Sequence, residues 1–420
     1  MVKTNKIKVL YVGYILQGDP GATGSTLHNI YSNCENTQIL QYCLDYEPTF
    51  HTTQVDTVYL SRYKSVLFSL LKDIYRKKNK ITENNGGESI ASHQKNIILD
   101  VAKGILDITS KKTGKKNLKI IDEFQPDIIL CLAENISTLN AALYFSKRYN
   151  SPIVVHVMDD IEQNIYKLKA TYVFRKRYLK LLKKVYARSL KGIAISPKMA
   201  KEYQRRHTIP FAFAMNCIKE TYNVDLPNNE PLRIYFSGGL HGGRADQLAH
   251  IGKVLIEKIG KNIKLDVFTS KANIGQYKDL LEPYCDLHEY VPKEKLFDNL
   301  LKADILLHCE SFDATEVKYF KYSMSTKIPE YLSVGRPILC YGPNDVCTVS
   351  YLRENEVGFV VENDQELIMA INKLQDIKTR VALGKNAIEV AKRDHLVKNV
   401  SDRVEDVFRI NMSLWEPYKL

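Results

Sequence analysis

The sequence predicts an α/β protein built from two Rossmann-like domains, each with a parallel sheet. At 420 residues the chain exceeds what one ordinary hydrophobic core holds, which favours two domains. A buried strand, a glycine-containing loop and a helix that begins near Ser25 follow one another from residue 8, and the same order returns at residues 232–259. Between and after these repeats, short apolar strands alternate with helical segments, which is the order of elements that builds a parallel sheet.

The first predicted domain, residues 1–217, opens with a buried strand at 8–15. The loop after it contains Gly21 and Gly24, and we expect both to line a ligand-binding cleft, although a plain turn explains them equally well. Two further buried strands are predicted at 126–133 and 152–158, each followed by a helical or polar segment.

The strand at 152–158 ends in two adjacent acids, Asp159 and Asp160. Open α/β sheets bind ligands at the carboxyl ends of their strands, so Asp159 is a candidate for acceptor binding or for a catalytic base. His156 lies inside the strand, and we interpret it as a buried structural histidine.

A polar linker is expected at residues 218–231, and the second domain at 232–396. The first strand of this domain runs into Gly238, Gly239 and two more glycines before Arg244. Glycines allow the backbone to approach a phosphate closely, and an arginine can bind it with two hydrogen bonds. We therefore expect a phosphate site in this loop, with a helix beginning at residue 246.

Residues 323–343 predict a short helix between a polar loop and a buried strand. Ser325 or Thr326 is expected to cap the helix, and Gly335 to adopt the left-handed conformation after it. Free backbone N–H groups and Lys327 would attract an anion to the N-terminal end. Glu330, one turn further, can accept two hydrogen bonds from a diol. Together these features predict a nucleotide site.

The segment from Glu330 to Ile338 resembles the donor site of GT-B glycosyltransferases, above all the large retaining group called family 4. The resemblance implies two Rossmann-like domains facing a central cleft, with residues 397–420 forming a helix and tail that return to the first domain. It further implies that Val291 faces the nucleobase. That family places a first glutamate where this chain has Tyr322, and Glu316 is the candidate to replace it.

The implied reaction is transfer of a sugar, with retention of configuration, from a nucleotide diphosphate sugar to a glycan or lipid-linked glycan in bacterial surface-polysaccharide synthesis. Arg244, Lys327 and the helix end would stabilise the leaving diphosphate without a metal or another cofactor. Two alternatives stay open. A sugar-nucleotide epimerase of the same fold would keep the donor pocket, and a non-enzymatic protein that binds membrane or RNA would explain the charge.

The net charge of +12 makes nucleic acids, anionic membranes and anionic substrates candidate partners. Basic residues concentrate at 62–80 and 166–191, where apolar residues recur at helical spacing. Such helices suit an anionic bilayer surface, although a solvated helix face explains either segment equally well. Neither segment has the repeated aromatic residues of a single-strand binder, so nucleic acid is not expected.

The remaining composition favours the cytoplasm. The chain contains no apolar run of about 18 residues, and its start lacks the apolar region of a secretory signal. Its eight cysteines include no C-x-x-C pair and no zinc-like spacing with histidine. We therefore expect a reducing compartment, no bound metal, and peripheral contact with the inner face of the cell membrane through the two basic segments.

Overall fold

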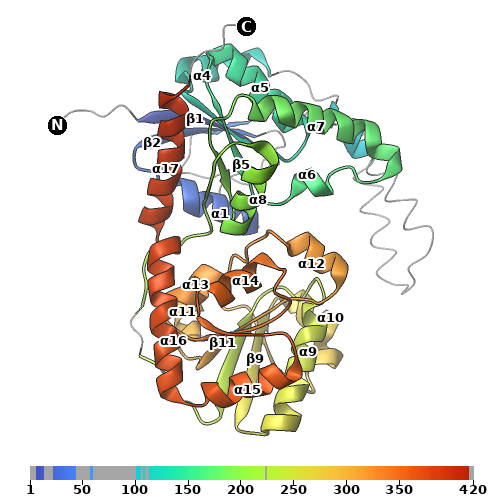
Figure 1. Ribbon diagram of the computed structural model, residues 1–420, viewed down its shortest axis with the longest axis vertical. Helices are drawn as coiled ribbons and strands as arrows, with labels where there is room; N and C mark the ends of the chain where they lie inside the picture. Colours follow the sequence, from blue (N-terminus) through green and yellow to red (C-terminus); the bar gives the residue numbers. More distant parts are fainter. Residues whose placement is uncertain are drawn as a thin grey trace, which may run out of the picture. The chain divides into compact units, whose positions relative to one another are not determined.

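The computed structural model describes residues 6–13, 22–43, 57–59, 101–105, 107–108, 113–222 and 225–415. Gly21 and the basic segment 62–80 lie outside these ranges. The chain divides into two compact units. Unit 1 comprises Met1–Ala194, Ala200–Ala212 and Val404–Leu420, and unit 2 comprises Ile195–Met199 and Phe213–Arg403. Each unit is a sheet flanked by helices, which confirms the predicted α/β class (Figure 1).

Within the described residues, the sheet of unit 1 has seven strands, in the order β3-β2-β1-β4-β5-β6-β7. The pairings from β3 through β6 are parallel. β1 and β4 are fully buried over most of their length because they are central and covered on both faces. The strands are β1 (Ile7–Gly13), β2 (Thr37–Cys43), β3 (Thr57–Tyr59), β4 (Ile128–Leu132), β5 (Ile153–Val157), β6 (Gly192–Ala194) and β7 (Phe211–Phe213).

The helices associated with this sheet are α1 (Ala22–Tyr31), α4 (Lys115–Phe124), α5 (Ile136–Tyr149), α6 (Ile161–Asn164), α7 (Tyr172–Tyr186) and α8 (Pro197–His207). The start of α5 shows how the sequence fixes one of them. Asn135 and Thr138 form a capping box there, and the buried Asp107 carboxylate accepts hydrogen bonds from the N–H groups of Ile136 and Ser137 at 2.7 and 2.8 Å. α5 packs against α7 (Figure 1).

Unit 2 has a six-stranded sheet in the order β10-β9-β8-β11-β12-β13, and all its pairings are parallel. Its core includes Ile234, Val267, Leu307 and Leu339 from the sheet and Leu248 from a covering helix. The strands are β8 (Leu232–Ser237), β9 (Ile263–Thr269), β10 (Asp286–Glu289), β11 (Ile305–Cys309), β12 (Ile338–Tyr341) and β13 (Gly358–Val361).

The helices of the second half are α9 (Arg244–Val254), α10 (Lys271–Leu281), α11 (Leu296–Leu300), α12 (Ala314–Phe320), α13 (Ile328–Ser333), α14 (Cys347–Glu354), α15 (Asp364–Leu374), α16 (Ile377–Val390) and α17 (Val397–Ser413). Short 3₁₀ or π turns occur at η1 (Lys169–Thr171), η2 (Leu255–Ile259), η3 (Lys293–Lys295) and η4 (Ala391–His395). α17 begins in unit 2, and from Val404 onward it belongs to unit 1.

Three helix starts differ from the expectations drawn from the sequence. Gly24 lies in the first turn of α1, so it is a buried helix residue and not a loop glycine. α9 begins at Arg244 and not at residue 246, because Gly243, with φ of 74°, is its N-cap. Lys327 and not Ser325 or Thr326 is the N-cap of α13. For α9 and α13 the local pattern placed the start within two residues.

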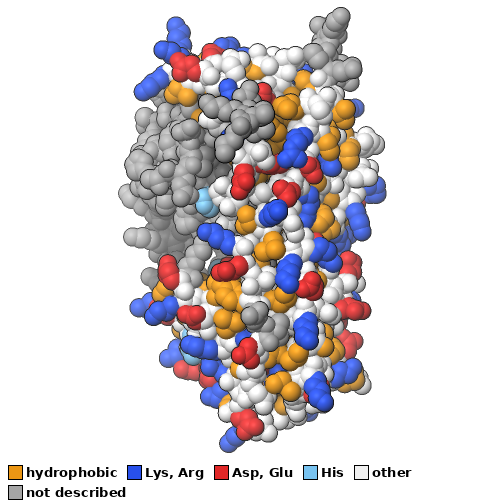
Figure 2. Space-filling model, turned by 90° about the vertical axis from the view of Figure 1, so that its left-hand side faces the viewer, with side chains coloured by type: hydrophobic (Ala, Val, Ile, Leu, Met, Phe, Trp, Pro, Cys, Tyr) orange, Lys and Arg blue, Asp and Glu red, His pale blue; other side chains and the backbone are white. Residues whose placement is uncertain are grey.

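The surface carries charges of both signs. Figure 2 shows Lys and Arg side chains interspersed with Asp and Glu over one face of the molecule. On the exposed side of α17, for example, Arg409 pairs with Asp406. Within the described residues, no helix combines the length and apolarity needed to cross a membrane.

Candidate functional site

The sheet of unit 2 has a topological switch point between β8 and β11. From β8 the chain adds β9 and β10 on one side, and from β11 it adds β12 and β13 on the other. Open α/β sheets bind ligands in the crevice at the carboxyl ends of such strands. Gly238 follows β8 directly, and Glu310 follows β11. The residues predicted to bind a phosphate therefore surround the position where this architecture places a ligand.

Arg244 is fixed at this switch point from two directions. Its Nη2 donates to Glu310 Oε2 at 2.7 Å, and its Nε donates to the carbonyl of Cys309 at 3.3 Å. Its guanidinium carbon lies 5.2 Å from the ring centroid of Phe320 on α12. Because 21% of the side chain remains exposed, Arg244 is both held in place and accessible to an anion.

Glu310 is the buried anchor of this arginine. Its other carboxylate oxygen, Oε1, lies 3.0 Å from His308 Nε2. Burial alone would raise the pKa of the Glu310 carboxyl, but the bonds and charges of His308 and Arg244 hold it below its ordinary value. Glu310 is therefore ionised at neutral pH and keeps the guanidinium oriented.

The glycine loop between β8 and α9 has a backbone that other residues adopt poorly. Gly242 and Gly243 have φ of 67° and 74°, in the left-handed region. A side chain at Gly243 would also collide with Ser311, whereas one at Gly239 would meet only the edge of His241. The conformational requirement thus lies at Gly242 and Gly243 and not at the predicted Gly238 and Gly239.

A buried tyrosine joins α13 to the same loop. The backbone N–H of Ser237, the last residue of β8, donates to Tyr331 Oη at 2.8 Å. Asn216 Nδ2 donates to the carbonyl of Thr326 at 3.0 Å and holds the segment before the helix. At the other end, Gly335 has the predicted left-handed φ, at 63°. α13 is therefore fixed beside the end of β8.

This placement brings Lys327 and Glu330 to the switch point. Lys327 Nζ lies 3.9 Å from Glu330 Oε2, and 36% of the lysine side chain is exposed. The same Nζ lies 5.9 Å from the ring centroid of Tyr290, which precedes the half-buried Val291. Ser325 and Thr326 are half-buried in the segment before α13, and Ser325 Oγ accepts a 3.4 Å bond from the N–H of Lys327.

Arg336 and Glu316 lie near these residues in the sequence but have other surroundings. Arg336 is fully buried and donates to the carbonyls of Ala303, Val334, Asp225 and Leu301, so it holds loops together and does not face a ligand. Glu316, the candidate for the missing first acid, lies on α12 with its carboxylate next to Gly242. An acid is thus present at the glycine loop.

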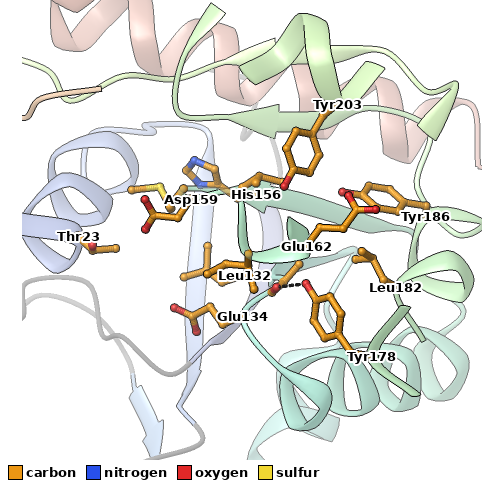
Figure 3. Close-up of a pocket in the computed structure, with 14 residues that line it drawn as sticks. Thr23, Leu132, Glu134, His156, Asp159, Glu162, Tyr178, Leu182, Tyr186 and Tyr203 are labelled. Atoms are coloured by element: carbon orange, nitrogen blue, oxygen red, sulfur yellow. Dashed lines mark hydrogen bonds between the residues drawn. The ribbon is translucent and has the colours of Figure 1, made fainter. Parts of the chain in front are cut away.

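Unit 1 contains a pocket at the carboxyl ends of β4 and β5, beside the start of α1. It holds about 470 Å³ of empty space, part of it open to solvent. Figure 3 shows the side chains that surround it. Its polar lining residues are Thr23, Glu134, His156, Asp159, Glu162, Tyr178, Tyr186 and Tyr203.

The structure separates the two adjacent acids of the sequence. Asp159 lines the pocket. Asp160 is buried and accepts two hydrogen bonds from Arg206, at 2.7 and 3.0 Å, and one from Tyr203 Oη at 2.8 Å. Asp160 therefore has a structural role and leaves Asp159 as the candidate for chemistry.

His156 is buried, as predicted, and burial lowers its pKa to about 3. Its Nδ1 lies 2.7 Å from Tyr31 Oη. Its Nε2 has no hydrogen-bond partner among the described residues, and the side chain lines the pocket. The interpretation of His156 as a structural histidine therefore explains the hydrogen-bonded Nδ1 but not Nε2.

No protein-family profile and no curated protein sequence matches the chain. Solved structures do match it over nearly its full length. TarM matches with a TM-score of 0.60 at 10% identity, covering 97% of this chain and 100% of the other. WaaG, described as a glycosyltransferase involved in lipopolysaccharide biosynthesis, matches with 0.54 at 13% identity, covering 96% and 99%. A glycosyltransferase from Rickettsia africae matches with 0.59 at 9%, covering 98% and 100%.

The chain has the GT-B fold. The predicted pair of Rossmann-like domains is thereby confirmed. The predicted site residues divide between the two units. Unit 2 contains Gly238, Gly239, Arg244, Val291, Lys327 and Glu330, and unit 1 contains Gly24 and Asp159. Nowhere in the described ranges do three His, Cys, Asp or Glu side chains gather as metal ligands would.

Sequence reasoning missed Glu134 in this GT-B chain. It follows β4, lines the same pocket as Asp159, and has a pKa raised to about 8, first by burial and then by the charge of Asp159. The signal was available, because Glu134 occupies the same place after β4 that Asp159 occupies after β5, and neighbouring parallel strands end at the same edge.

Proposed function

We propose that this protein transfers a sugar from a nucleotide diphosphate sugar to a hydroxyl of a glycan or lipid-linked glycan. The observation that carries the proposal is the bond between Ser237 and Tyr331, which joins the glycine loop to α13. This bond holds the glycine loop that precedes Arg244 next to the helix that carries Lys327 and Glu330. The GT-B fold supports the same reaction class, since the matched structures include glycosyltransferases.

Each donor-site residue has a chemical role in this proposal. Arg244 and Lys327 bind the diphosphate, and Glu330 accepts hydrogen bonds from the ribose diol. During transfer, the bond from the anomeric carbon to the diphosphate oxygen breaks and its electron pair leaves with the nucleoside diphosphate. The acceptor oxygen bonds to the same carbon and loses its proton. The two fixed cations stabilise the negative charge that develops on the diphosphate, so we expect no metal requirement.

The resemblance of residues 330–338 to the retaining family 4 group leads us to propose retention of configuration. One matched structure is described as a TarM mutant in complex with UDP and α-GlcNAc-glycerol, and another as a lipopolysaccharide enzyme. These descriptions support a nucleotide sugar as donor and bacterial surface polysaccharide as the setting for this chain.

The experiment is to incubate the protein with nucleotide sugars, with and without saccharide acceptors, and to measure nucleoside diphosphate. We expect release that depends on the acceptor, together with a glycoside product whose anomeric proton reports retention. Isomerisation of the nucleotide sugar without an acceptor would instead establish the epimerase alternative.

We also propose that α7 binds an anionic membrane surface. The helix packs inward through Tyr178, Leu182, Val185 and Tyr186, and its exposed residues include Lys176, Arg177, Lys180, Lys183 and Lys184. At its start, Tyr172 and Val173 are 55% and 71% exposed. Aromatic and aliphatic side chains next to a basic face suit the boundary between lipid headgroups and acyl chains.

Replacing Lys176, Lys180 and Lys184 by Glu should therefore weaken binding to phosphatidylglycerol vesicles by about 100-fold, since each basic side chain contributes about 1 kcal/mol near such a surface. Sedimentation with vesicles at two salt concentrations measures the effect. The control reverses three exposed lysines on α4, namely Lys115, Lys116 and Lys119. Equal losses in both triple variants would show nonspecific attraction and contradict a docking role for α7.

A further inference from the structure

At the end of β11, a buried glutamate connects the arginine of the candidate donor site to a histidine. We propose that Glu310 and His308 are positioning residues, which act on a bound diphosphate only through Arg244, by holding its guanidinium in one orientation. The proposal rests on the proposed function for the identity of that diphosphate as part of a nucleotide sugar. The positioning itself is testable with inorganic pyrophosphate and needs no sugar donor.

Both carboxylate oxygens of Glu310 are engaged. Oε2 accepts a hydrogen bond from Arg244 Nη2 at 2.7 Å, and Oε1 lies 3.0 Å from His308 Nε2. Although burial opposes ionisation, the bonds and charges of His308 and Arg244 keep the pKa of the Glu310 carboxyl below its ordinary value. The ionised carboxylate only accepts hydrogen bonds, so His308 Nε2 is the donor. Glu310 therefore cannot turn away from Arg244 without breaking its bond to His308.

The sheet holds this pair of side chains rigidly. His308 and Glu310 are two residues apart at the end of β11 and therefore point to the same face of the strand. The N–H of Glu310 donates to the carbonyl of Tyr341 at 3.0 Å, which extends the pairing with β12 by one residue. The side chains of Glu310 and His308 are only 4% and 7% exposed, whereas Arg244 is 21% exposed. The arginine is thus the member of the group that an anion reaches.

The sign of the effect separates positioning from simple electrostatics. Glu310 carries a negative charge beside Arg244, so removing that charge would by itself strengthen the attraction for pyrophosphate. A glutamine at residue 310 offers one acceptor oxygen to two donors, so either Arg244 or His308 loses its bond. A guanidinium that has become mobile must be ordered when the anion binds, which weakens the affinity. Positioning therefore predicts weaker pyrophosphate binding after the loss of a negative charge.

The same sheet contains a second arginine–acid–histidine group that serves as a matched control. Asp266 on β9 pairs with Arg233 at 2.9 Å through Oδ2 and lies 2.9 Å from His288 Nε2 through Oδ1. Its side chain is 4% exposed, as is that of Glu310. Arg233 is the second residue of β8, at the opposite end of this strand from the glycine loop. Asp266→Asn therefore disturbs a buried group of the same composition away from Arg244.

The first measurement is isothermal titration with inorganic pyrophosphate. We expect Glu310→Gln and His308→Ala each to weaken binding by about 10-fold, the cost of ordering one long side chain. His308→Gln should recover most of the loss, because its amide N–H can replace Nε2 as donor to Glu310. In Arg244→Ala, adding Glu310→Gln should weaken binding no further, since the glutamate acts through the arginine. Asp266→Asn should stay within about twofold of wild type.

The second measurement is NMR of the arginine side chains, in which the Arg244 signals are assigned by their loss in Arg244→Ala. An ordered guanidinium gives separate signals for its two Nη groups, and a mobile one gives an averaged signal. We expect separate signals in wild type and an averaged signal in Glu310→Gln. If Glu310→Gln does not fold, the comparison of His308→Ala with His308→Gln decides the same question.

Four results would overturn the proposal: unchanged or tighter pyrophosphate binding in Glu310→Gln, an equal loss in Asp266→Asn, an averaged Arg244 signal in wild type, or no binding of pyrophosphate to wild type. The two proposals can fail separately. If pyrophosphate binding depends on Glu310 but no nucleotide sugar is consumed, the positioning stands and glycosyl transfer is wrong. If transfer occurs and Glu310→Gln has the kcat/KM of wild type, glycosyl transfer stands and the positioning is wrong.

Discussion

Arg244→Ala is expected to lower kcat/KM for sugar transfer by about 100- to 1000-fold, the range found when one group that stabilises developing charge is removed. The guanidinium is already oriented by Glu310 and by the Cys309 carbonyl, so it binds the diphosphate without reorganising. Steady-state kinetics with a donor that the protein accepts measures the loss. Arg244→Lys should recover part of it, because lysine keeps the charge but not the second hydrogen bond.

A matched control separates this role from stability. Arg233 lies near the start of β8, the strand that leads into the glycine loop. It pairs with Asp266 at 2.9 Å, as Arg244 pairs with Glu310 at 2.7 Å. Arg233→Ala also breaks an arginine–carboxylate pair in unit 2, but at the end of β8 away from the glycine loop. It should keep kcat/KM within about threefold of wild type. Similar losses in both variants would mean that Arg244 acts only through the fold.

Glu330→Ala is expected to weaken nucleotide-sugar binding by about 100-fold, because two charge-assisted hydrogen bonds to a diol would be lost. Isothermal titration with the best donor measures the change, and the 2′-deoxy analogue should lose less affinity in the variant than in wild type. Glu389→Ala is the control, since Glu389 also pairs with a lysine three residues away, Lys392, but on the exposed surface of α16. Unchanged affinity in Glu330→Ala would remove the glutamate from the donor site.

Local sequence patterns were sufficient for the alternation of strands and helices and for the left-handed Gly335, because strand burial and turn conformation depend on neighbouring residues. They were insufficient for the start of α13. This helix is also held by Tyr331, whose hydroxyl accepts a hydrogen bond from the N–H of Ser237, 94 residues away. A capping rule that considers the next three residues cannot include such a contact.

The site shows the same division. Asp159 and Arg244 were predicted from the sequence because Asp159 follows a strand and Arg244 follows a glycine loop, and a sequence displays both patterns directly. Glu310 was not predicted as a site residue, because its role comes from packing. Glu134 was overlooked, although it follows β4 as Asp159 follows β5. Glu310 is selected by its contact with Arg244, and Glu134 by burial beside Asp159. Burial and long-range pairing are properties of the folded chain, and local sequence patterns do not show them.

Thermal shift against a panel of nucleotide sugars tests the donor site most directly. We expect at least one nucleotide diphosphate sugar to raise the Tm, since a ligand at 100 times its Kd adds about 2.7 kcal/mol of stability. Arg244→Ala and Glu330→Ala should abolish this rise. A panel in which no nucleotide sugar raises the Tm, or in which both variants respond like wild type, would contradict it.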